Sequence, residues 1–164
     1  MNKIYLYKQI VLGGTFDCIH KGHISLLESG FKLGERVVIG LSSDSLVKHL
    51  GKRVTNGYKV RLRQLNGFLK NRYKNRKYVI VELKDHYGPA LDYESDAIVV
   101  SEETDKFADE CNLVRRVMGL PPLHKIVVPL ILAEDGDRIS STRIRNKEID
   151  STGRSLSQDC KGTR

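Results

Sequence analysis

The chain has 164 residues, 40% of them hydrophobic and 29% charged, and 28 Lys and Arg against 20 Asp and Glu give a net charge of +8. This is ordinary globular composition, long enough for one domain with a real core. No apolar run approaches the ~20 residues that cross a bilayer, and the N-terminus lacks the apolar segment of a signal peptide. Three well-separated cysteines argue against a disulfide framework, so we expect a cytoplasmic protein.

Strand-like and helix-like patterns alternate along the chain. Strands are expected at continuous apolar runs, and helices where apolar residues recur every three or four positions. In chain order the patterns predict a strand at 9–13, a helix at 20–33, a strand at 36–41, a short helix at 44–50, a loop at 51–57, a basic helix at 58–73, strands at 78–83 and 97–101, a helix at 104–120, a strand at 126–132 and a helix at 140–149. The core face of the helix at 104–120 is expected to carry Phe107, Cys111, Val114 and Met118.

This alternation indicates a parallel sheet covered by helices on both faces. We therefore expect an α/β fold: a single Rossmann-like, doubly wound domain over residues 1–150 with a five-stranded parallel sheet. Residues 151–164 are polar and without periodicity, so they are expected to form a disordered tail. Ligands of such sheets bind beyond the carboxyl ends of the strands. Three polar clusters, GGTFD, SSD and SEET, follow predicted strands there.

The first of these clusters has the features of a phosphate site. Gly13 and Gly14 follow the first strand, and Thr15 and Asp17 precede the next helix. Glycines let backbone N–H groups approach a polyanion, and a helix N-terminus adds partial positive charge. A Gly-Gly pair alone is weak evidence, because most such pairs are simply turns.

His20 and His23 lie three positions apart at the start of the next predicted helix, so both rings can face one side. Three interpretations are open. A zinc pair would need a third ligand, and none is evident nearby. A packed or exposed pair without a role is the second. The third is a pair of hydrogen-bond donors to phosphate oxygens, in which the phosphate would raise the histidine pKa.

A second stretch, DGDRISSTRIR at 135–145, also indicates an anion site. Ser140, Ser141 and Thr142 open a helix, where hydroxyls act as N-caps. A helix N-cap needs only one such residue, whereas three precede Arg143 here. This arrangement fits an anion-binding site made of hydroxyls, backbone N–H groups and a guanidinium. Capping alone remains an alternative for this stretch taken by itself. Two anion sites at strand-to-helix junctions make that alternative weaker for the pair.

The chain also contains a strongly basic run. Eight Lys and Arg and no acid lie between Lys59 and Lys77. The run is compatible with a nucleic-acid surface, and equally with a solvated helix face. Aromatic residues within it are few and no RNA-recognition motif is visible. We therefore expect no nucleic-acid partner and no membrane partner, and the oligomeric state stays open, with a monomer among the options.

The stretch GGTFDCIHKGH resembles the (T/G)xFDxxHxGH signature of the nucleotidylyltransferase superfamily, and ISSTRIR resembles its second signature, ISSTxxR. Together the two motifs are much more specific than either alone, and the resemblance covers residues 9–149. SEETDKF and DGDRISSTRIRNKEID are most similar to the archaeal and eukaryotic type of phosphopantetheine adenylyltransferase. This implies that ATP, carrying Mg²⁺, and 4′-phosphopantetheine react to give dephospho-coenzyme A and pyrophosphate.

The resemblance also implies roles by motif position. The residues implied to contact the transferred and flanking phosphates, or to shape the nucleotide site around them, are Gly13, Gly14, Thr15, Phe16, Asp17, His20 and His23. Those implied to hold the outer phosphates are Ser140, Ser141, Thr142 and Arg143. The loop lysine of the family maps best to Lys52, with Lys48 and Arg53 as alternatives, while Arg61 and Arg115 are weaker candidates. Catalysis is assigned to His20, His23, Lys52 and Arg143, with no protein metal ligand.

Other nucleotidyl transfers on the same scaffold remain alternatives. FMN adenylyltransferase is one, and glycerol-phosphate cytidylyltransferase is another, although the latter type shows an RTxGIST-like second motif where this chain has DRISSTRIR. Because a phosphate monoester is already ionised at neutral pH, its attack on the α-phosphorus needs no general base. The expected contribution of the site is in-line positioning and charge stabilisation.

Overall fold

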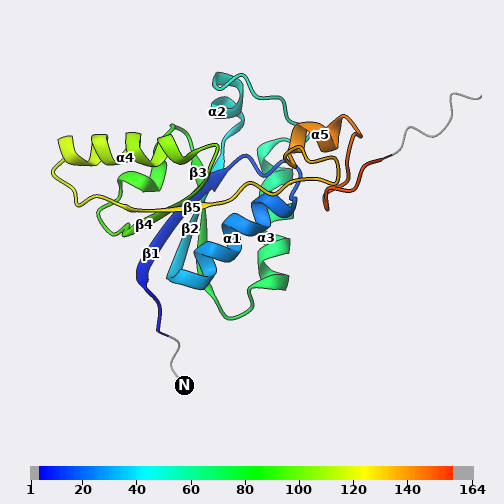
Figure 1. Cartoon of the computed structure of the whole chain (residues 1–164). Helices are drawn as coiled ribbons and strands as arrows, with labels where there is room; N and C mark the ends of the chain where they lie inside the picture. The colour runs from blue at the N-terminus through cyan, green and yellow to red at the C-terminus, as the bar shows by residue number, and fades with distance from the viewer. Residues whose placement is uncertain (1–3, 157–164) are drawn as a thin grey trace, which may run out of the picture.

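The structure is a computed structural model that describes residues 4–156. Figure 1 shows strands and helices alternating along the chain. The elements are β1 (Tyr7–Gly14), α1 (Lys21–Leu33), β2 (Gly34–Ser42), α2 (Asp44–His49), α3 (Tyr58–Arg72), β3 (Lys77–Leu83), the 3₁₀ helix η1 (Gly88–Leu91), β4 (Ala97–Ser101), α4 (Asp105–Val117), β5 (His124–Val128) and α5 (Ser141–Arg145). No helix in the described part of the chain is long and apolar enough to cross a membrane.

The five strands form one parallel sheet in the order β3-β2-β1-β4-β5, which confirms the predicted fold class. The chain winds outward from β1 to β2 and β3, and then returns to place β4 on the other side of β1. The order therefore reverses between β1 and β4. In open parallel sheets, ligands bind in the crevice beyond the carboxyl ends of the strands at such a point. Gly13 and Gly14 end β1 at this edge.

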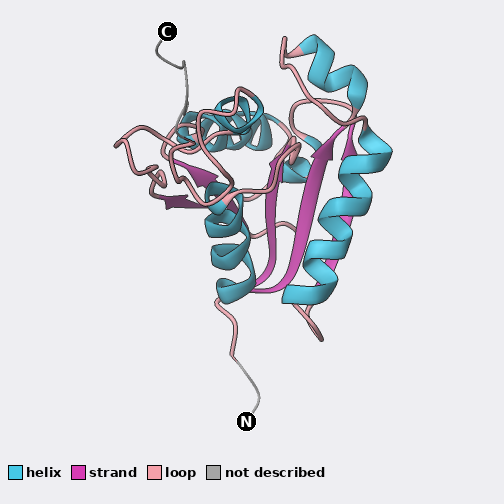
Figure 2. Ribbon diagram, turned by 90° about the vertical axis from the view of Figure 1, so that its right-hand side faces the viewer, coloured by secondary structure: helices cyan, strands magenta, loops and turns pink. Residues whose placement is uncertain are grey.

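The sheet is buried on both faces because successive strand residues point to opposite sides. Ile10 and Leu12 of β1 belong to the core formed with α1 and α3. Val11, between them, belongs to the core that includes Cys111 of α4. Figure 2 shows helices packed against both faces of the sheet. This explains why the strands read as continuous apolar runs in the sequence.

Two predicted elements near the C-terminus differ from the structure. The strand expected at 126–132 is instead His124–Val128, and it ends before Pro129, which cannot donate a ladder hydrogen bond. The helix expected at 140–149 ends at Arg145. Its last predicted residue, Ile149, instead forms an isolated antiparallel bridge with Ser155.

The first residues of the polar tail expected from residue 151 form backbone hydrogen bonds with the rest of the chain. The Glu134 N–H donates to the Gly153 carbonyl at 2.9 Å, and Gly153 is buried with a φ of 87°. A Cβ at Gly153 would lie 2.6 Å from Ile139, so the close approach requires glycine. Gly153 is therefore packed while the other residues of 151–156 are exposed, and residues 157–164 of the expected tail lie outside the described residues.

Helix α4 packs on the sheet through the predicted face at Phe107 and Cys111, but the predicted face does not continue past its C-terminal end. Cys111 is buried as expected, whereas Met118 is 55% exposed. Arg115 is fully buried instead, and its guanidinium donates to backbone carbonyls, including those of Ala90 and Asp92, both at 2.8 Å. Arg115 therefore anchors the segment before β4, and its weaker assignment to phosphate binding is wrong.

Candidate active site

The first motif forms the loop between β1 and α1. Phe16 is fully buried in this loop with a φ of 48°, a left-handed conformation that is unusual outside glycine. A Cβ on Gly14 would approach the Phe16 ring to 3.0 Å. The ring therefore packs beneath the Gly14 turn, and its role in shaping the backbone fits this geometry.

The two histidines of the motif stack on one another at the N-terminus of α1. Their ring centroids are 3.9 Å apart, and the Phe16 ring lies 4.8 Å from that of His23. His20 is the N-cap residue of α1, and its Nδ1 accepts a hydrogen bond from the Gly22 N–H at 3.1 Å. An accepting Nδ1 is unprotonated, so the proton of the neutral ring is on Nε2. His20 is thereby oriented with one N–H donor free for a ligand.

Both imidazoles are neutral in the ligand-free protein. Burial lowers the pKa of His20 to about 4. Burial, followed by the neighbouring charge of His20, lowers the pKa of His23 to about 3. The Cys18 carbonyl opposes this by favouring the protonated ring, and the charge of Lys52 adds a smaller lowering effect. A bound phosphate would oppose these effects, because an opposite charge favours the protonated ring.

The neutral pair gives stability a defined pH dependence. In the unfolded state the two histidines bind protons below about pH 6.5, whereas in the folded state they stay neutral until about pH 4. The free energy of unfolding is therefore highest above pH 6.5 and decreases as the pH falls toward 4. We expect a slope of about 1.4 kcal/mol per pH unit for each histidine in this window. Urea unfolding at pH 7.5, 6 and 5 measures it. The variant His20→Gln/His23→Gln should flatten the curve, and an equally steep curve in that variant would exclude the pair as its source.

Two polar atoms of the site lack partners. In residues 4–156, the buried side-chain N and O atoms without a hydrogen-bond partner are Thr15 Oγ1, His23 Nδ1 and Tyr73 Oη. The first two lie in one motif, and the histidine packs beside Phe16 of the same loop. Buried polar groups are normally hydrogen-bonded, and exceptions call for an explanation. A ligand that supplies oxygen atoms at this point would satisfy both.

The absence of a side chain at Gly22 leaves room for the His20 ring. A Cβ at Gly22 would lie 3.0 Å from the Nδ1 and Cε1 atoms of His20. We expect Gly22→Ala to displace the ring and lower kcat by about tenfold to 10²-fold. Stability should be kept, because Ala favours helix over Gly by about 1 kcal/mol. Steady-state rates and thermal melts measure both, with Gly67→Ala on α3, where no atom lies within 4 Å, as the control. Equal rates for the two variants would contradict this role.

The fold brings the second motif against the first. Ser141 Oγ donates to the Cys18 carbonyl at 3.3 Å, and Arg145 Nη1 lies 3.1 Å from Asp17 Oδ2. In Figure 1, α5 lies next to the loop that leads into α1. Ser140 caps α5 by accepting from the Arg143 N–H at 3.3 Å. Ser141 and Thr142 follow it at the helix start, so the stretch both caps the helix and meets the first motif.

The two arginines of α5 have different surroundings. Arg143, the predicted phosphate ligand, pairs with Asp135 and Glu148 and donates to the Arg138 carbonyl. Arg145 instead faces Asp17 of the first motif and donates to Thr142 Oγ1 at 3.0 Å. The sequence assignment overlooked Arg145, although it occupies the final position of the ISSTxxR signature, which was the signal that could have found it.

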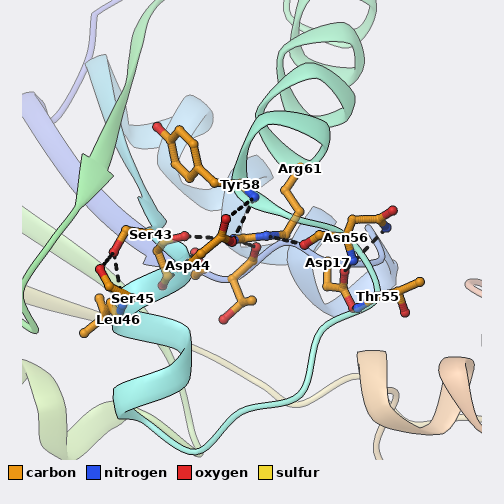
Figure 3. A network of polar contacts seen from close by, with 12 residues as sticks. Asp17, Ser43, Asp44, Ser45, Leu46, Thr55, Asn56, Tyr58 and Arg61 are labelled. Carbon is orange, nitrogen blue, oxygen red and sulfur yellow. Dashed lines mark hydrogen bonds and ion pairs between the residues drawn. The ribbon is translucent and has the colours of Figure 1, made fainter.

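Lys52 lies in the loop between α2 and α3 and is exposed, as are its alternatives Lys48 and Arg53. The charge of Lys52 makes the smallest of the contributions that lower the pKa of His23. Arg61, in contrast, is fully buried and donates to the Thr15, Ser42 and Asn56 carbonyls, so it is not free to bind phosphate (Figure 3).

Comparison with known proteins supports one family over nearly the whole chain. Residues 11–147 match the family described as cytidylyltransferase-like. The phosphopantetheine adenylyltransferase of Methanopyrus kandleri is 43% identical over 151 residues, covering 92% of this chain and 96% of that protein. The phosphopantetheine adenylyltransferase of Pyrococcus furiosus is 42% identical over 157 residues, covering 93% and 96%.

Solved structures agree with the fold. A protein of unknown function from Archaeoglobus fulgidus superposes with a TM-score of 0.67 at 30% identity, covering 73% of this chain and 88% of that one. The nicotinic acid mononucleotide adenylyltransferase of Plasmodium falciparum has a TM-score of 0.54 at 14% identity, covering 89% and 86%, and supports the fold alone. The resemblance stated from the motifs is confirmed: the chain belongs to the cytidylyltransferase-like family and, within it, to the phosphopantetheine adenylyltransferases found in archaea.

Proposed function

We propose that this enzyme transfers the adenylyl group of ATP to the phosphate of 4′-phosphopantetheine. An oxygen of the acceptor phosphate bonds to the α-phosphorus while the bond to the bridging oxygen breaks, and pyrophosphate carries away the electron pair and the negative charge. The acceptor is already ionised at neutral pH, so no proton is removed from it. The protein must align the two substrates and stabilise the charge on the oxygens.

The observation that carries this proposal is the pair of unpartnered buried atoms in the first motif. Thr15 Oγ1 and His23 Nδ1 are buried without partners in the described chain. His20 offers an Nε2 donor, because its Nδ1 already accepts from Gly22. We propose that these groups bind the α-phosphate. Neutral donors fixed before substrate arrives are suited to stabilising charge as it develops.

The remaining assigned residues are proposed to act on the outer phosphates. The Ser141 hydroxyl contacts the first motif, Thr142 follows it in α5, and Lys52 is an exposed residue of the 51–57 loop. Arg145 joins this group because it bonds Thr142. Arg143 would have to leave Asp135 and Glu148 to bind phosphate, so we assign it a holding role for the 135–148 segment unless substrate recruits it.

Magnesium is proposed to enter as part of the ATP complex. Between residues 4 and 156, no group of three or more His, Cys, Asp or Glu side chains is arranged to hold a metal ion. The phosphates themselves are suitable oxygen ligands for Mg²⁺. When bound, the ion neutralises charge on the departing pyrophosphate, and the protein residues need only hold the phosphates. A cytoplasmic location without nucleic-acid or membrane partners is also part of the proposal.

An acceptor panel tests this function. The purified protein is mixed with Mg²⁺ and either ATP or CTP, and then with 4′-phosphopantetheine, FMN or glycerol 3-phosphate, while pyrophosphate release is recorded. We expect release with ATP and 4′-phosphopantetheine at a rate far above the other pairs. A folded protein that binds ATP but responds only to FMN, or only to CTP with glycerol 3-phosphate, would contradict the assigned acceptor.

A further inference from the structure

The loop at 51–57 needs to be held in place if Lys52 is to reach the phosphates. Its first part is tied to α2, because the Lys52 N–H donates to the Val47 carbonyl at 3.1 Å. Its last part meets two side chains from elsewhere in the chain, Asp17 and Arg61. The loop is therefore fixed at both ends, and Lys52 is the residue whose backbone is tied to α2 at the first of them.

The backbone of Asn56 is held from both sides. Arg61 Nε donates to the Asn56 carbonyl at 2.9 Å, and Asp17 Oδ1 accepts from the Asn56 N–H at 3.0 Å. The other carboxylate oxygen of Asp17 accepts from the Thr55 N–H at 2.8 Å. Figure 3 shows Asp17 and Arg61 converging on this part of the loop. We call this arrangement, Asp17 and Arg61 on the backbone of Thr55 and Asn56, the Asn56 clamp.

The two charged side chains of the Asn56 clamp are buried and bond to the site, whereas Thr55 is exposed. Asp17 is 2% exposed and Arg61 is 0% exposed. Arg61 Nη1 also donates to the Thr15 carbonyl at 2.8 Å, and Asp17 is paired with Arg145. Charged side chains are almost never buried this far unless paired. Here their bonds run to the loop and to both phosphate-binding motifs, so one network sets the relative positions of all three.

We propose that Asp17 and Arg61 are positioning residues that fix the Lys52 loop against the histidine pair and the second motif. Asp17 acts through the loop and contacts no phosphate itself, in contrast to its assignment to the nucleotide-binding stretch. This inference rests on the proposed function, since the role of Lys52 belongs to it.

Amide hydrogen exchange tests the Asn56 clamp without using activity. In Asp17→Asn, the amides of Thr55 and Asn56 should exchange at least tenfold faster than in the wild type, while those of β1 and α4 stay protected. Asp109→Asn, which alters an exposed carboxylate paired with Lys125 on the surface, is the matched control and should leave both unchanged. Unaltered exchange at Thr55 and Asn56, or equal acceleration across the whole sheet, would overturn the proposal.

A double-mutant cycle tests whether the clamp acts through Lys52. We expect Asp17→Asn to lower kcat about tenfold, in line with a small misplacement of a catalytic group. The variant Asp17→Asn/Lys52→Ala should be no slower than Lys52→Ala alone, because the clamp has nothing left to position. If the two losses simply multiply, Asp17 acts independently of Lys52 and the proposal fails.

Thr55→Pro covers the case in which Asp17→Asn does not fold. Proline removes the N–H that Asp17 Oδ2 accepts, while Asp17 keeps its charge and its pairing with Arg145. Faster exchange at Asn56 and a similar loss of kcat are expected, and wild-type kcat would overturn the proposal. If the wild type transferred no adenylyl group to 4′-phosphopantetheine, the proposed function would be contradicted. The hydrogen-exchange experiment would still show whether Asp17 holds the backbone of Thr55 and Asn56.

Discussion

Replacing His23 with alanine is expected to lower kcat for adenylyl transfer by about 10²–10³-fold while the protein stays folded. The ring stacks on His20 and packs beside Phe16, and its Nδ1 is one of the unpartnered buried atoms of the site. Removing one well-aimed donor to a developing oxyanion typically has an effect of this size. Single-turnover kinetics with saturating ATP and acceptor separate this loss from weaker binding.

His124→Ala provides the matched control. His124 begins β5 at the amino-terminal edge of the parallel sheet, away from the first motif, and contacts Tyr7. Its replacement should change kcat less than twofold. If His23→Ala turned over at a rate near the wild type, His23 would have no part in stabilising the transferred phosphate.

Replacing Arg61 with alanine is expected to lower the free energy of unfolding by about 3 kcal/mol or more. Its guanidinium satisfies the carbonyls of Thr15, Ser42 and Asn56, and each buried carbonyl left without a partner costs about 1–3 kcal/mol. Its ion pair with Asp44 contributes little, because the Asp44 side chain is 59% exposed. Urea unfolding at pH 7.5 measures the change.

Two further variants separate the causes of that loss. Arg61→Met keeps most of the volume without the donors, so it should be nearly as destabilised as Arg61→Ala. Arg63→Ala removes an exposed arginine from the same helix and should shift stability by less than about 0.5 kcal/mol. Wild-type stability in Arg61→Met would mean that packing, rather than the carbonyl bonds, accounts for the burial of Arg61.

The sheet was predictable because its strands are continuous apolar runs. Ile10, Val11 and Leu12 must all be buried, and that requires helices on both faces. The end of the chain was harder to predict. Gly153 packs against Ile139, but no sequence pattern near either residue predicts a contact between positions that far apart in the chain. Composition alone could not distinguish a packed polar segment from a free one.

The motif residues were predictable because their spacing is distinctive, whereas the partners of the arginines were not. Arg61 and Arg115 look like surface cations in the sequence, and the structure buries both against backbone carbonyls. Arg143 and Arg145 both lie in the short helix α5, and the packing of this helix determines which of them faces the first motif. The fold aims Arg145 at Asp17 and leaves Arg143 with Asp135 and Glu148.

The central claim is that the unpartnered atoms of the first motif bind the phosphate that is transferred. A crystal structure with Mg²⁺ and a non-hydrolysable ATP analogue tests it most directly. The account predicts α-phosphate oxygens within about 3 Å of Thr15 Oγ1 and of a ring nitrogen of the histidine pair, with the outer phosphates beside Ser141 and Thr142. An analogue bound with its phosphates elsewhere, and with Thr15 Oγ1 and both histidines still unengaged, would contradict it.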